Sequence, residues 1–86
     1  MPRISRFFGI TVAMFYNDHA PPHFHAFYGE YETVISIETL EIREGSLPRR
    51  ALALVLEWAA IHRGDLMADW ERARQGLPLE SIEPLE

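Results

Sequence analysis

The chain has 86 residues, a formal net charge of −5 and no cysteine. That length suits a single domain with a modest core, and association with a partner or a second copy would increase its stability. The missing cysteines exclude disulfide bonds and thiolate metal sites, and so acidic a chain is not built for bulk attraction to nucleic acid. No apolar run is long enough to span a membrane, and the N-terminus lacks the apolar segment of a signal peptide, so we expect a cytoplasmic protein with no membrane partner.

Three segments are rich in β-branched and aromatic residues, which favour strands. They are 10–16, 23–28 and 32–38. A weaker candidate at 41–44 follows a turn without the usual turn-forming residues. The preceding segment, 4–9, is short and mixed, and we expect its Phe7 and Phe8 to pack inward. The pattern predicts an antiparallel β-meander of three or four strands.

The hydrophobic period becomes helical near residue 48. Ser46 can cap a helix, and Pro48 is tolerated in its first turn. Segment 49–62 then carries an apolar stripe at helical spacing, wide enough for a helix laid on a sheet. Its members are Leu52, Val55, Leu56 and Ala59, with Trp58 beside them.

A second helix and a tail complete the chain. We expect Gly64 to break or bend the first helix and Asp65 to cap a second at 66–75. Gly76 provides the C-terminal stop. In the tail at 77–86, apolar residues recur every third position, which suits an extended segment docked on the body or on a partner. These residues are Leu79, Ile82 and Leu85.

Together the elements predict an α+β fold in one domain, 1–86, because strands and helices that are segregated along the chain form separate layers. The expected architecture is a three- or four-stranded antiparallel β-meander at about 10–44 and two helices packed on one face at about 48–75. An extended C-terminal tail follows at 77–86.

The most unusual feature is a histidine cluster at 17–25. Three of the four histidines lie there, with an aspartate and a Pro-Pro pair. Side chains two apart on a strand share a face. His23 and His25 therefore point the same way, and His19 can fold back toward them from the proline corner.

One interpretation is a metal site. His19, His23 and His25 form a facial set of imidazole ligands, and Asp18 is a further ligand or supports one. Imidazole is a usual ligand of divalent transition metals, so Zn or Ni is the expected ion. A fourth protein ligand is not evident.

A second interpretation is acid–base catalysis on RNA. A metal-independent ribonuclease needs one group to take the 2′-hydroxyl proton and another to protonate the leaving oxygen, and imidazoles can do both. The catalytic candidates are His19, His23 and His25, with Arg6 and Tyr16 to hold the phosphate.

A third interpretation is structural. Buried imidazoles can donate to carbonyl groups, and Asn17-Asp18 can form an Asx-turn that organises the bend. The residues by themselves leave all three interpretations open.

Three stretches carry a family resemblance. They are PRISRFFGI, YNDHAPPHFHA and GSLPRRALALV. With the overall length, they resemble a bacterial family called domain of unknown function 4160. The resemblance implies short single-domain proteins whose genes often sit beside a second small gene, in toxin–antitoxin-like pairs. Only His19, His23 and His25 map onto the family motif.

From the resemblance and the cluster together, we expect a component of a type II toxin–antitoxin-like module, on the toxin side. It would act through the His-rich surface, on RNA as a ribonuclease-like hydrolase, and bind the small cognate protein of the adjacent gene through an apolar surface. The alternative is a non-enzymatic metal-binding or protein-interaction module.

Overall fold

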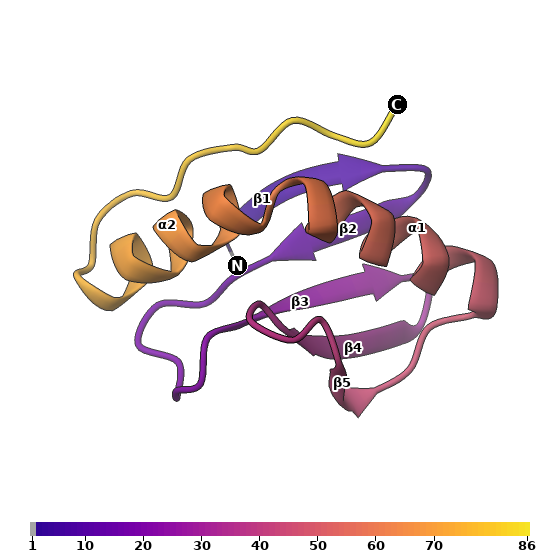
Figure 1. Ribbon diagram of the computed structural model, residues 1–86, viewed down its shortest axis with the longest axis horizontal. Helices are drawn as coiled ribbons and strands as arrows, with labels where there is room; N and C mark the ends of the chain where they lie inside the picture. Colours follow the sequence, from indigo (N-terminus) through magenta and orange to yellow (C-terminus); the bar gives the residue numbers. More distant parts are fainter. Residues whose placement is uncertain (1) are drawn as a thin grey trace.

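The computed structural model describes residues 2–86. Five strands form one antiparallel sheet in sequence order, and two helices follow them (Figure 1). The strands are β1 (Arg3–Phe7), β2 (Ile10–Ala13), β3 (His23–Tyr28), β4 (Tyr31–Ser36) and β5 (Ile42–Gly45). The helices are α1 (Arg49–Ile61) and α2 (Arg63–Arg74). This confirms the predicted α+β fold with an antiparallel meander before two helices.

The sheet has one strand more than the three or four predicted, because β1 pairs with β2. Strand β1 was not predicted because its pairing register shifts between Arg3 and Ser5, so that buried and exposed residues do not alternate along it. Phe7 is buried as predicted, but Phe8 is 60% exposed. Phe8 occupies the turn before β2 with a φ of 50°, which directs it away from the core.

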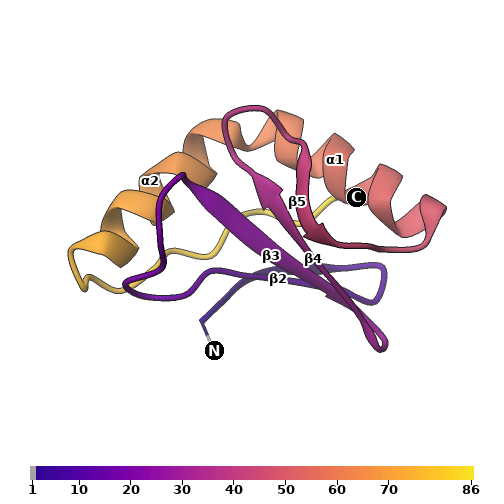
Figure 2. The ribbon, with the colours of Figure 1, turned by 90° about the horizontal axis from the view of Figure 1, so that it is seen from below.

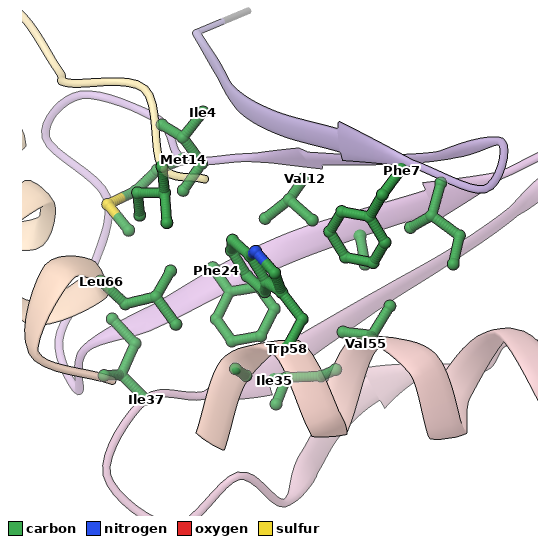
Figure 3. Close-up of a cluster of buried hydrophobic side chains, with 14 of the residues drawn as sticks. Ile4, Phe7, Val12, Met14, Phe24, Ile35, Ile37, Val55, Trp58 and Leu66 are labelled. Carbon is green, nitrogen blue, oxygen red and sulfur yellow. The ribbon is translucent and has the colours of Figure 1, made fainter. Parts of the chain in front are cut away.

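Both helices cover one face of the sheet, and the opposite face carries no helix (Figure 2). Figure 3 shows the core between the two layers. At its centre, the fully buried Trp58 ring lies 5.3 Å from the Phe7 ring and 6.0 Å from the Phe24 ring. Within residues 2–86, neither helix has the length and apolar character needed to cross a membrane.

Helix α1 begins at Arg49 as predicted, but α2 begins at Arg63 instead of residue 66, and the caps of both helices differ from the prediction. Ser46 does not cap α1, whose N-cap is Pro48 without a side-chain hydrogen bond. Gly64 does not separate the helices, because it lies within the first turn of α2 and the junction is His62 alone. Asp65 makes no capping bond either, since its carboxylate pairs with His62 Nδ1 at 3.1 Å.

The tail docks on the body of the same chain, as one predicted alternative had it. After the helical stop at Gly76, which has a φ of 72°, the chain turns back along β1 (Figure 1). Ile82 is buried, and its N–H donates to the Ile4 carbonyl at 2.7 Å. Leu79 and Leu85 pack against the core cluster. The tail thereby covers the edge of the sheet that β1 would otherwise expose.

Candidate metal centre

The loop at 14–22 brings Asp18 to the start of β3. The strand predicted at 10–16 ends at Ala13, and Asn17 takes a φ of 58°, a conformation that asparagine adopts more readily than most residues. The Oδ1 atom of Asp18 accepts a hydrogen bond of 2.9 Å from the His19 backbone N–H. This bond fixes the carboxylate and leaves Oδ2 for the histidines of β3.

His23 and His25 share a face of β3, as their spacing predicts. Their Nε2 atoms lie 2.8 and 3.2 Å from the same Asp18 Oδ2 atom, and their ring centroids are 5.4 Å apart. One ligand atom from each of the three residues lies within 4.8 Å of the other two. The fold therefore gathers Asp18, His23 and His25 around one point.

The other nitrogen of each ring also faces an acceptor. His23 Nδ1 lies 2.8 Å from the Pro21 carbonyl oxygen, and His25 Nδ1 lies 3.3 Å from Glu32 Oε2. A carbonyl only accepts, so His23 Nδ1 carries a proton, and in the neutral ring the Nε2 lone pair then points at a carboxylate. Two lone pairs facing each other repel. Positive charge therefore belongs between each Nε2 and Asp18, as a second ring proton or as a metal ion.

A single divalent cation would satisfy both rings at once. Metal-bound histidines commonly donate the second ring N–H to a carbonyl or a carboxylate, which is the arrangement of His23 and His25. Two imidazoles and one carboxylate are also the protein ligands of several catalytic zinc sites and of facial-triad iron sites. Such a set leaves coordination positions open for a ligand.

Asp18 is suited to hold positive charge. Burial by itself raises the pKa of this carboxyl, but hydrogen bonds from His23, His25 and the His19 backbone outweigh burial, and the pKa lies below its usual range. The carboxylate is therefore ionised at neutral pH and available as a ligand.

Aromatic rings hold both imidazoles in place. The His23 ring packs against Trp70 of α2, with a centroid distance of 5.0 Å. The His25 ring stands edge-on to Phe15 at 4.6 Å and parallel to Phe27 at 6.3 Å. Because these contacts restrict ring rotation, the site is arranged before a ligand arrives.

The three residues lie in an open depression of about 350 Å³. The other lining residues come from the loop, β4 and β5: His19, Ala20, Pro21, Glu32, Val34, Arg43 and Glu44. Among the described residues, the His19 imidazole is not one of the converging ligands. Arg6 lines a separate depression beside the tail, and Tyr16 is an exposed loop residue outside the site. The structure therefore brings the predicted site residues Asp18, His23 and His25 together. It places His19 at the rim of the depression, and Arg6 and Tyr16 outside the depression.

Sequence reasoning missed Glu32 and Arg43. Glu32 reads as a solvated strand residue, yet the β3–β4 register pairs His25 with Val34, which makes Glu32 the diagonal neighbour of His25. The turn at Gly29 would have revealed this register. No comparable sequence signal places Arg43 at the site, because its position depends on an irregularity in the pairing of β5 with β4.

Comparison with known proteins identifies the family. A family model described as Domain of unknown function (DUF4160) matches residues 9–71, which contain the loop, β3 and both helices up to Glu71. No curated protein and no solved structure matches the chain significantly. Because the match covers well over half of the chain, the protein belongs to the DUF4160 family.

Proposed function

We propose that the protein binds a divalent transition-metal ion, Zn or Ni, through Asp18, His23 and His25. The observation that carries this proposal is the convergence of three ligand atoms within 4.8 Å. The acceptors at both Nδ1 atoms support it, because they leave each Nε2 to a cation. The ion would act as a Lewis acid on a ligand that enters from the depression.

Metal titration of tag-free protein tests the site. Wild-type protein is expected to bind one ion per chain, measured by calorimetry and by metal content after gel filtration. Asp18→Asn and His25→Gln should each lose this binding. His62→Gln is the matched control, since His62 pairs with Asp65 and neither residue belongs to the ligand cluster or lines the depression. Equal metal content in all four proteins would disprove the proposal.

We propose as a second function that the protein is the toxin-side component of a type II toxin–antitoxin-like module in the cytoplasm. An apolar groove of about 150 Å³ supports this proposal, because it offers a docking surface for the small cognate protein. It is lined by Phe8, Ile10, Tyr28, Pro48, Arg50, Ala51 and Leu54. Arg50 and its neighbour Arg49 make no ion pair within residues 2–86. We therefore expect a partner segment with an apolar side chain next to a carboxylate.

In this second proposal the substrate is RNA, which the protein cleaves as a ribonuclease-like hydrolase. His19, whose imidazole is not one of the converging ligands, lines the same depression as Arg43, so a group for proton transfer and a group for holding a phosphate are within one site. The partner would restrain this activity from the groove.

Expression in a host cell, with and without the adjacent gene, tests the module. Alone, the protein should slow growth; with its neighbour, growth should recover and the two proteins should co-purify. Phe8→Asn should abolish co-purification, and asparagine tolerates the positive φ of this position. Tyr31→Asn is the control and should not abolish it, because Tyr31 is exposed outside the groove. Normal growth of cells that express the protein alone, together with no complex, would exclude the module.

A further inference from the structure

Strand β5 departs from regular pairing at Arg43. The register passes from Val34 opposite Glu44 to Ile35 opposite Ile42, so Arg43 has no partner on β4. Such a bulge inserts an extra residue and redirects its side chain, often beside a functional site. Successive residues of a regular strand point to opposite faces, yet Arg43 and Glu44 both line the depression. The bulge therefore places Arg43 in the lining of the depression that holds Asp18, His23 and His25.

The Arg43 guanidinium is not used within the fold. It forms no ion pair with any acidic residue of the described chain, although Glu32 and Glu44 line the same depression. Arg43 is also exposed, so solvent and ligands reach it. A guanidinium presents a planar set of donors that matches the oxygens of a phosphate or a carboxylate.

The charges around the depression show when an anion can enter. With neutral imidazoles, the carboxylates of Asp18, Glu32 and Glu44 against Arg43 give a net charge of −2. That charge repels an anion, and a divalent ion brings it to zero. With neutral imidazoles, the metal-loaded depression therefore favours an anionic ligand, which then meets two cationic groups, the ion and Arg43.

We infer that the metal-loaded depression binds a phosphate group, with one oxygen on the ion and others on the Arg43 guanidinium. The inference rests on the proposed metal site. A phosphate that gives one oxygen to the ion keeps further oxygens for the two parallel donors of the Arg43 guanidinium. A carboxylate has two oxygens, so it would keep only one for Arg43. Because binding is reciprocal, phosphate must also tighten the metal by the factor by which the metal tightens phosphate.

Cobalt provides the test, since Co²⁺ at the zinc position has a visible spectrum that depends on its ligands. Tag-free protein is loaded with one equivalent of Co²⁺ and titrated with inorganic phosphate, and in parallel with acetate. Absorption and the line width of the phosphate ³¹P resonance report binding. Arg43→Ala removes the guanidinium, Arg43→Lys keeps only the charge, and Arg63→Ala removes one positive charge outside the depression.

Phosphate is expected to change the cobalt spectrum and broaden the ³¹P line in the wild type and in Arg63→Ala. Arg43→Ala should bind phosphate at least about tenfold more weakly, since charge-assisted hydrogen bonds are lost, and Arg43→Lys should fall between. Equal phosphate affinity of Arg43→Ala and wild type overturns the inference, as does acetate binding with the same dependence on Arg43. In both of those cases the protein still binds cobalt, so the proposed metal site is not refuted. Failure to bind cobalt in phosphate-free buffer would refute the metal site instead.

Discussion

Zinc should raise the thermal stability of the protein by an amount that measures how far the fold prearranges the site. An ion that binds only the native state adds about 2.7 kcal/mol at 100 times its Kd, which corresponds to about 10–20 °C in Tm for a domain of this size. However, Asp18, His23 and His25 are close in sequence, so the unfolded chain also binds zinc. If it binds about tenfold more weakly, the gain falls to about 1.3 kcal/mol, or about 5–10 °C.

Circular dichroism melting of tag-free protein, with and without zinc, measures this gain. His62→Gln should show the wild-type rise, because its imidazole lies outside the site. Asp18→Asn should show almost none, because the carboxylate that both Nε2 atoms face is gone. If zinc raised Tm equally in Asp18→Asn and wild type, the ion would be binding elsewhere and the reasoning would be refuted.

Three further predictions concern the fold that supports the site. Ile82→Ala should lower the free energy of unfolding by about 2–4 kcal/mol because it opens a cavity under the docked tail. Leu77→Ala truncates an exposed side chain and should change this free energy by less than about 0.5 kcal/mol. Urea denaturation measures both changes. Gly45→Ala should lose more than about 2 kcal/mol in the same assay, because its φ is 72° and a Cβ would overlap the Glu32 carbonyl oxygen. Burial raises the pKa of Asp69, so its neutral form is favoured in the fold, and the free energy of unfolding should decline as the pH rises from the usual carboxyl pKa through the raised one. Asp69→Asn should remove that decline, as measured by urea denaturation at several pH values.

Each of these predictions has a result that contradicts it. Equal losses in Ile82→Ala and Leu77→Ala would mean that the tail does not contribute through burial. A Gly45→Ala protein as stable as the wild type would mean that β5 can shift away from β4. Parallel pH curves for Asp69→Asn and wild type would mean that Asp69 is hydrated in solution.

The sequence alone determined the local features of this protein. Strand period and helical period are read within short windows, which is why the meander, the two helices and the face shared by His23 and His25 were predicted. The apolar spacing of the tail likewise indicated a docked segment. The histidine cluster was found because its residues are contiguous, so that composition alone marks them. The start of α1 at Arg49 was predicted correctly, but the two caps and the start of α2 were wrong. Capping depends on how the chain enters a helix, and Pro48 and His62 took the cap positions assigned to Ser46 and Asp65.

Only the tertiary structure decided which groups meet. Arg6 pairs with Thr11, and Thr11 pairs with Phe27, so strand register places Arg6 toward the end of β3 that is remote from His23. The direction of a loop side chain such as His19 follows from backbone dihedral angles that composition does not specify. Glu32 reaches His25 through hairpin register, and Arg43 reaches the depression through a bulge. Register and bulges depend on pairing between distant segments, and this pairing adds Glu32 and Arg43 to the candidate site at Asp18, His23 and His25.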